Sequence, residues 1–188
     1  YGGIYNKFNI TPDIVIYGKA IANGYPLTAV VGKRDIMEEA NNSFISSTFW
    51  TDRIGYVAAL KTLEFMNHKQ SWKIITKTGK NIKKRWVKLA RKYNLKINVT
   101  GLDALPSFIL PYKDWIKYKT YITQEMLMEK ILATNAIYVS VAHKELQIDK
   151  YFSILDKIFK NIQEFENGKD INLYLKTTPS QTSFGRLN

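Results

Sequence analysis

The sequence contains no cysteine and only two histidines in 188 residues. Without cysteine, disulfide bonds and thiolate metal sites are excluded, and a reducing cytoplasm is the expected location. The two histidines, His68 and His143, have no partner at a metal-ligand spacing, so we expect no metal site. His143 follows an apolar segment, and a hydrogen-bonding role at the edge of the core is the favoured interpretation.

Long apolar runs are also missing. The longest, such as residues 14–17 and 29–31, are far shorter than the roughly 20 residues that span a bilayer, so no transmembrane helix is expected. The N-terminus shows no basic segment followed by an apolar stretch and a small-residue cleavage site, which gives no support for secretion. The first residue is Tyr1 rather than Met, and we interpret the chain as a fragment whose natural start lies upstream.

Acidic residues are few compared with basic ones, because 28 lysines and arginines against 16 aspartates and glutamates give a formal net charge of +12. Most of the excess lies in residues 73–92, where basic and apolar residues are interleaved with helical spacing. This pattern predicts an amphipathic helix with a solvated basic face. The alternative is a non-catalytic remnant or binding module that uses this helix on an anionic partner; no recognised nucleic-acid module accompanies it.

Apolar and aromatic side chains are abundant, at 45% and 13% of the residues, which is enough to build a core and argues against disorder. Local patterns predict an α/β chain in which strands and helices alternate first and a smaller mixed unit follows. The expected strands are residues 14–17, 27–32, 95–99, 107–110 and 136–141. The expected helices are residues 35–41, 52–66, 73–93, 124–134 and 148–166, with Asp52 near the start of the second.

One lysine lies where chemistry is expected. Residues 12–26, PDIVIYGKAIANGYP, contain a turn signal, a short apolar strand predicted to be buried, and then Gly18 and Lys19. A side chain in a glycine-flanked turn at the end of such a strand lies at the sheet edge where ligands of open α/β proteins commonly bind. A lysine amine held there can react with a carbonyl group. On spacing alone, an ordinary surface lysine is the competing interpretation.

The wider pattern is more specific. The segment at residues 12–26, with the following AVVGKRDIM run at 29–37, resembles the cofactor-lysine segment of class III aminotransferases, in particular the group of glutamate-1-semialdehyde 2,1-aminomutase and its aminotransferase relatives. The similarity continues through STFWTDRIG at residues 47–55. In that family the lysine after the glycine forms the Schiff base with pyridoxal phosphate, which corresponds to Lys19. A family threonine that reaches across the dimer to the cofactor phosphate corresponds to Thr48, with Thr51 as the alternative.

The resemblance implies a fold, a cofactor and partners. The fold would be that of fold-type-I pyridoxal-phosphate transferases, with residues 1–70 as the end of the large α/β domain and residues 71–188 as the small C-terminal αβ domain. The substrates would be a small-molecule amino donor and a carbonyl compound, and the assembly a homodimer with shared active sites. The family's glycine-rich phosphate turn, ring-stacking aromatic residue and pyridine-binding aspartate would all precede residue 1. We therefore expect the chain by itself to be inactive, and the choice between mutase and transaminase stays open.

Overall fold

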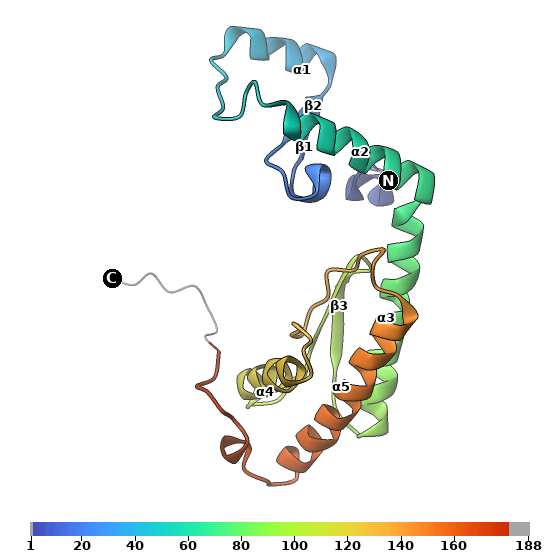
Figure 1. Cartoon of the computed structure of the whole chain (residues 1–188), viewed down its shortest axis with the longest axis vertical. Helices are drawn as coiled ribbons and strands as arrows, with labels where there is room; N and C mark the ends of the chain where they lie inside the picture. Colours follow the sequence, from blue (N-terminus) through green and yellow to red (C-terminus); the bar gives the residue numbers. More distant parts are fainter. Residues whose placement is uncertain (1, 181–188) are drawn as a thin grey trace, which may run out of the picture. The chain divides into compact units, whose positions relative to one another are not determined.

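The structure is a computed structural model that describes residues 2–180. The chain divides into two compact units, Tyr1–Trp72 and Lys73–Asn188, which we call unit 1 and unit 2. Both units combine helices with a two-stranded antiparallel sheet (Figure 1). Among residues 2–180, no helix has the length and apolar character needed to cross a membrane.

Unit 1 is built from a pair of short strands and the helices around them. Its elements are η1 (Ile4–Phe8), β1 (Ile14–Tyr17), η2 (Lys19–Ala22), β2 (Ala29–Gly32), α1 (Arg34–Glu38), η3 (Glu39–Asn42) and α2 (Arg53–Lys69), where η denotes a 3-10 helix. β1 and β2 are antiparallel, with Ile14 opposite Gly32 and Tyr17 opposite Ala29. The η2 turn, which begins with Lys19, therefore lies in the connection between two paired strands.

The two strands of unit 1 are exposed, and the prediction of buried strands is wrong for the described chain. Ile16 is 71% exposed, and Ile14, Val30 and Val31 are each close to half exposed. The physical reason is that this sheet has only two strands within residues 2–180, and the described elements of unit 1 leave much of its apolar surface exposed. Apolar faces of this kind are normally buried against further strands or helices.

Helix α2 begins as the sequence predicts. Asp52 is its N-cap, and the carboxylate oxygen Oδ1 accepts a hydrogen bond of 2.8 Å from the backbone N–H of Ile54. Such a bond satisfies one of the amide groups that have no partner inside the helix. The helix ends at Gln70, whose left-handed backbone stops the chain from continuing in the same direction.

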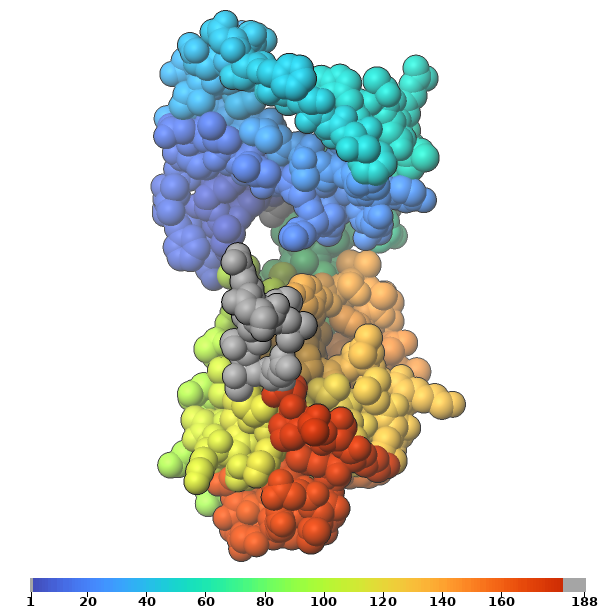
Figure 2. Space-filling view, turned by 90° about the vertical axis from the view of Figure 1, so that its left-hand side faces the viewer, coloured from blue at the N-terminus to red at the C-terminus, as the bar shows by residue number. Residues whose placement is uncertain are grey.

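Unit 2 contains one hairpin and three long helices. Its elements are α3 (Ser71–Lys92), β3 (Asn98–Leu102), β4 (Leu105–Ile109), α4 (Trp115–Met128), α5 (Glu145–Glu166) and η4 (Ile171–Leu173). Figure 1 shows α5 running beside α3, in agreement with an ion pair of 2.6 Å from Lys92 to Asp156. The segment after α5 lies against α4, where Gln124 Nε2 donates to the carbonyl of Tyr174 over 3.0 Å. Figure 2 shows this segment in red on the surface of unit 2.

A continuous hydrophobic core holds unit 2 together. Phe108 on β4 is fully buried and makes edge-on contacts with Trp86 of α3, Trp115 of α4 and Phe159 of α5 at ring-centroid distances of 4.9, 6.1 and 5.9 Å. Such aromatic contacts add to the gain from removing apolar surface from water. The Trp86 indole N–H donates to the hydroxyl of Tyr151 over 3.0 Å, so the buried polar group of this tryptophan is satisfied.

The basic helix is α3, and its amphipathic character is confirmed. Its apolar residues Ile82, Trp86 and Leu89 are buried in the core. Several of its cations bind acidic groups of unit 2, as in the ion pair of 2.6 Å between Arg85 and Asp149, and others lie at the surface, as Lys88 does. The long stems of lysine and arginine allow this arrangement, because they cover apolar surface while the charged ends stay in water.

Three predictions in unit 2 need correction. The strand expected at residues 95–99 is β3, which begins at Asn98 and ends at Leu102. The helix expected at residues 124–134 is α4, which begins at Trp115 and ends at Met128; its aromatic and β-branched first half resembles a strand in local sequence. The strand expected at 136–141 is a single bridge between Ser107 and Ala136. Backbone hydrogen bonds next to this bridge have the same antiparallel pattern, and the N–H of Ile137 donates to the carbonyl of Pro106. The reciprocal hydrogen bond cannot form, because Pro106 has no N–H.

Candidate active site

Lys19 lies directly after β1 and has an unusual backbone conformation. Its φ is +53°, in the left-handed region that residues with a side chain rarely adopt, which costs about 1 kcal/mol or more. The side chain is exposed, and within the described residues no hydrogen bond or ion pair engages its Nζ. The turn is kept in place by the backbone N–H of Ile21, which donates to the carbonyl of Gly18 over 3.1 Å. A lysine with a strained backbone and an amine that has no described hydrogen-bond partner is typical of a functional position.

Small residues allow the Lys19 turn to pack closely on α2. Ala22 of the turn and Ala59 of α2 are 1% and 6% exposed, and they are the buried hydrophobic residues that the structure describes in residues 2–72. A Cβ at Gly55 would lie 2.9 Å from the carbonyl oxygen of Pro26 and 3.3 Å from Leu27 Cβ. A side chain at this position would therefore push the loop that follows Lys19 away from the helix.

A second set of contacts joins the start of β1 to the end of β2. The backbone N–H of Lys33 donates to the carbonyl of Asp13 over 3.0 Å, and its Nζ pairs with the Asp13 carboxylate at 2.6 Å. A Cβ at Gly32 would lie 2.5 Å from that same carbonyl oxygen, so the close approach requires glycine. These contacts therefore join the two halves of the sequence pattern, PDIVIYGK and AVVGKRD. They hold together the two strands that flank the loop with Lys19.

Thr48 and Thr51 lie in the turn that immediately precedes α2. Both are exposed, and no hydrogen bond of either hydroxyl is found within the described residues. The turn is shaped by the backbone N–H of Asp52, which donates to the carbonyl of Phe49 over 3.1 Å. Within residues 2–180, no hydrogen bond joins Lys19 to either threonine, and both exposed hydroxyls are available to a further group.

His143 has the hydrogen-bonding role that its position suggested. Its Nδ1 accepts a bond of 3.2 Å from the backbone N–H of Ser140, in the segment that leads into α5. Within residues 2–180, no three His, Asp or Glu side chains come close enough together to hold a metal ion.

The residues that position the Lys19 turn have no recognisable role in the sequence alone. Gly55, Gly32 and the Asp13–Lys33 pair were part of the quoted segments, but their function is visible only in the contacts described above. A signal did exist for Gly55, because a glycine inside a strong helical pattern often marks a close approach of another backbone. No local sequence pattern indicates the ion pair between Asp13 and Lys33, because the two residues are 20 positions apart.

The site can be compared with known proteins. Residues 4–156 match the family model of the class-III aminotransferases. The chain is 31% identical over 143 residues to the 3-aminobutyryl-CoA aminotransferase of Cloacimonas acidaminovorans, which covers 76% of this chain and 32% of that protein. It is 24% identical over 181 residues to the glutamate-1-semialdehyde 2,1-aminomutase of Methanocaldococcus jannaschii, covering 86% and 42% of the two chains.

Solved structures show the same fold. The FumI protein of Sphingopyxis sp. MTA144, in a form with pyridoxal phosphate, has a TM-score of 0.79 at 18% identity, covering 90% of this chain and 42% of that one. A transaminase with bound pyridoxal phosphate has a TM-score of 0.78 at 17% identity, covering 88% and 42%. The predicted fold type I is confirmed.

This chain spans about a third to two-fifths of the length of the relatives described above. Within that span, the family model covers most of the chain, including the Lys19 turn, the turn with Thr48, and the greater part of unit 2. The chain therefore belongs to the class-III aminotransferase family.

Proposed function

We propose that the protein containing this chain is a pyridoxal-phosphate-dependent aminotransferase or 2,1-aminomutase in which Lys19 holds the cofactor. The observation that carries the proposal is the Lys19 turn, where an exposed amine with no described partner follows β1 in a strained conformation. The family match includes this turn. The substrates would be a small-molecule amino donor and a carbonyl compound. In the aminomutase reaction, the amino donor and the carbonyl acceptor are parts of the same molecule.

The donor set of unit 1 fits this cofactor. An amine condenses with an aldehyde, and the Lys19 Nζ is the amine with no competing partner in the strained turn. A phosphate accepts hydrogen bonds from hydroxyl groups, and Thr48 has an exposed hydroxyl in the turn before α2. When bound, pyridoxal phosphate supplies an aldehyde and an electron-withdrawing ring that favours loss of a proton from the adjacent substrate carbon.

The role of this chain is positioning and proton transfer. Ala22 packs against α2, and Asp13 is bonded to Lys33, so both ends of the loop are held in place. These contacts fix the position of the Lys19 backbone, from which the Nζ extends. Lys19 would hold the cofactor through its Nζ, and the same amine could take a proton from one carbon and return it to another. We propose that Thr48 acts at the site of a partner subunit in a homodimer, because its exposed hydroxyl has no hydrogen-bond partner among the described residues.

Covalent labelling tests the Lys19 assignment. The complete protein that contains this chain is incubated with pyridoxal phosphate, reduced with borohydride and digested, and the modified lysine is identified by mass spectrometry. We expect the pyridoxyl group on Lys19, and its complete loss in Lys19→Arg, which keeps the charge but removes the reactive amine. Lys7→Arg is the matched control in the same unit and should label as the wild type does. Preferential labelling of any other lysine would overturn the proposal.

One observation favours a second candidate function. An open groove of about 470 Å³ on unit 2 is lined by four cations, Lys83, Lys84, Lys88 and Arg91, above Val87 and Val99. Nucleic-acid binding by this groove would weaken steeply with salt, because bound cations release counterions from phosphates. Binding of a 20-base-pair duplex at 50 mM salt that is independent of pyridoxal phosphate would support this candidate, and no binding would exclude it.

A further inference from the structure

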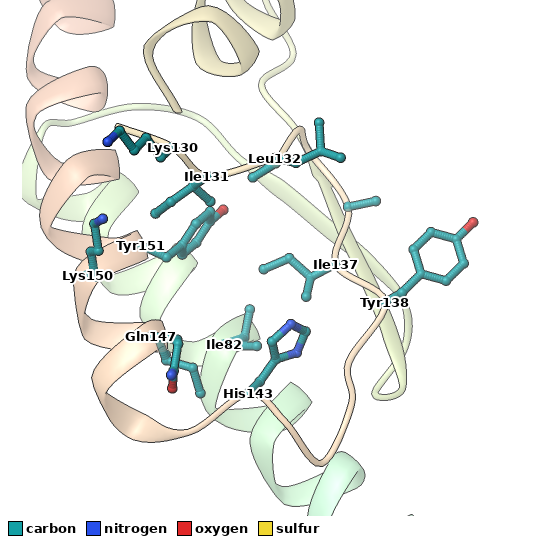
Figure 3. Close-up of a pocket in the computed structure, with 13 residues that line it drawn as sticks. Ile82, Lys130, Ile131, Leu132, Ile137, Tyr138, His143, Gln147, Lys150 and Tyr151 are labelled. Carbon is teal, nitrogen blue, oxygen red and sulfur yellow. The ribbon is translucent and has the colours of Figure 1, made fainter. Parts of the chain in front are cut away.

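A cavity in unit 2, remote in sequence from the Lys19 turn, combines an apolar interior with hydrogen-bond donors. Its volume is about 570 Å³, within the range that holds small organic ligands. Ile82 of α3, Ile131 and Ile137 of the segment between α4 and α5, and Ile148 of α5 contribute apolar surface. Figure 3 shows Ile82 and Ile137 pointing into the cavity, whereas Tyr138 points away from it.

Four polar side chains of the cavity can donate hydrogen bonds to a ligand: Lys130, Lys150, His143 and Gln147. Lys130 and Lys150 lie on the same side of it (Figure 3), and no aspartate or glutamate is among the lining residues. The His143 Nδ1 accepts from the N–H of Ser140, which places the proton of the neutral ring on Nε2 as a donor. The Gln147 Oε1 accepts from the N–H of Lys144, which leaves its amide N–H groups as donors.

The backbone of Lys130 provides an independent observation. Lys130 has a φ of +61° at the end of α4, where its N–H donates to the carbonyl of Leu127 and the N–H of Ile131 donates to the carbonyl of Met126, both over 2.9 Å. This is the Schellman arrangement, in which the left-handed position is usually glycine. A lysine at this position is conformationally unfavourable, and strain of this kind is commonly found where a side chain has a function.

We propose that this cavity binds a small amphipathic organic anion, with its carboxylate or phosphate at Lys130 and Lys150 and its apolar part against the isoleucines. The proposal rests on charge complementarity, because the lining offers two ammonium groups, the side chains of His143 and Gln147 as donors, and no carboxylate. The Lys150 Nζ donates to the carbonyl of Glu129 over 3.2 Å, and its other N–H groups remain for an anion. The volume matches a ligand with a short hydrocarbon chain. All the lining residues of the cavity belong to unit 2, and the proposal does not depend on the role of Lys19.

Binding is tested with octanoate, octyl phosphate and the neutral 1-octanol on the 188-residue chain labelled with carbon-13 in the isoleucine methyl groups. Both anions should shift the methyl signals of Ile131 and Ile137, and should bind about fivefold or more tightly than 1-octanol, given the strength of hydrogen bonds to charged groups. Ile14 and Ile16, on the exposed strands of unit 1, report non-specific adsorption and should not shift. Equal affinity for 1-octanol, or equal shifts at Ile14 and Ile16, would overturn the proposal.

Two substitutions separate binding from folding. Lys130→Gly removes one charge and relieves the left-handed strain, so it should weaken octanoate binding about threefold to tenfold while the melting temperature stays equal or rises. Lys150→Gln should weaken binding to a similar degree. Lys157→Gln, on the same helix but outside the cavity, is the charge-matched control and should bind as the wild type does. Unchanged affinity in both Lys130→Gly and Lys150→Gln would exclude the site.

Discussion

The two units of this chain differ in how they use their apolar residues. In unit 2, a connected cluster that includes Trp86, Phe108 and Phe159 removes its largest side chains from water. In the described part of unit 1, the buried hydrophobic residues are Ala22 and Ala59, while Phe44 is 96% exposed. The region with the most specific sequence pattern is therefore the region with the smallest core of its own.

This difference indicates that unit 2 has a core that stabilises it, whereas unit 1 buries little apolar surface of its own. Burial of apolar area is the dominant favourable contribution to folding, and two alanines contribute little of it. The exposed apolar strands on either side of the Lys19 turn support the expectation that the chain alone is inactive. They also predict self-association, because unpaired strand edges and large apolar patches favour it.

The largest expected effect is the loss of a core aromatic residue in unit 2. Phe159 is fully buried, and Phe159→Ala should lower the free energy of unfolding by about 3–5 kcal/mol because it leaves a cavity. The matched substitution Phe44→Ala in unit 1 should change it by less than about 0.5 kcal/mol. Urea unfolding followed by near-ultraviolet circular dichroism measures both. Similar losses in the two variants would contradict the comparison of the units.

Each unit has a helical glycine against which a loop packs, and the same substitution tests both. A Cβ at Gly79 of α3 would lie 1.6 Å from the carbonyl oxygen of Asp103, so Gly79→Ala should destabilise unit 2 by about 1–3 kcal/mol despite the better helix propensity of alanine. Gly55→Ala, with its nearest contact at 2.9 Å, should have a smaller effect on stability.

Gly55→Ala should instead reduce the yield of pyridoxyl label at Lys19, because it displaces the adjacent loop. Borohydride labelling gives this yield, and hydrogen exchange at the Ala22 amide reports the loosening of the turn. Gly79→Ala should leave both measurements unchanged. An unaltered label yield and unaltered exchange in Gly55→Ala would show that the close packing does not position Lys19.

The proposed role of Thr48 predicts an effect on cofactor binding rather than on folding. In the complete protein, Thr48→Ala should weaken pyridoxal phosphate binding about tenfold, since a hydrogen bond to a charged group is worth roughly 1.5–3 kcal/mol. Thr51→Ala is the matched control from the same turn and should bind normally. Fluorescence titration with the cofactor measures both. A loss confined to Thr51→Ala would transfer the role to that residue.

The smallest effect concerns the acid stability of unit 2. Burial alone raises the pKa of the Asp156 carboxyl, but hydrogen bonds from Lys92 and Tyr93 outweigh it and hold the pKa below its ordinary value. A lowered pKa stabilises the fold above the unfolded-state pKa of about 3.9, and this contribution is lost as the pH falls through the folded-state value.

Asp156→Asn should therefore be less stable than the wild type at pH 7, and the difference should shrink as the pH falls below about 4. Tyr93→Phe, which removes the hydrogen bond of 2.9 Å to Asp156, should lower the free energy of unfolding by about 1 kcal/mol at pH 7. Thermal melting between pH 3 and pH 7 measures these changes. A difference between Asp156→Asn and the wild type that does not vary with pH would contradict this linkage.

The sequence predicted the elements whose signal is local and strong. Asp52 marks the start of α2, the interleaved basic and apolar residues give α3, and the spacing of apolar residues gives α5. It failed for α4, because aromatic and β-branched residues after Trp115 have a strand-like local pattern that packing in the core overrides. It also failed for residues 136–141, where pairing depends on Pro106 of a neighbouring strand.

The sequence by itself determined the family and the position of Lys19 after a short strand, since both depend on residues that are neighbours in the chain. Only the tertiary structure decided the left-handed backbone of Lys19 and the close approach of its loop to Gly55. The tertiary structure also brings the donors around the cavity in unit 2 together, because Lys130 and Lys150 belong to different segments of the chain. Local patterns record periodicity and propensity, whereas contacts between distant segments are selected by packing and charge across the whole fold.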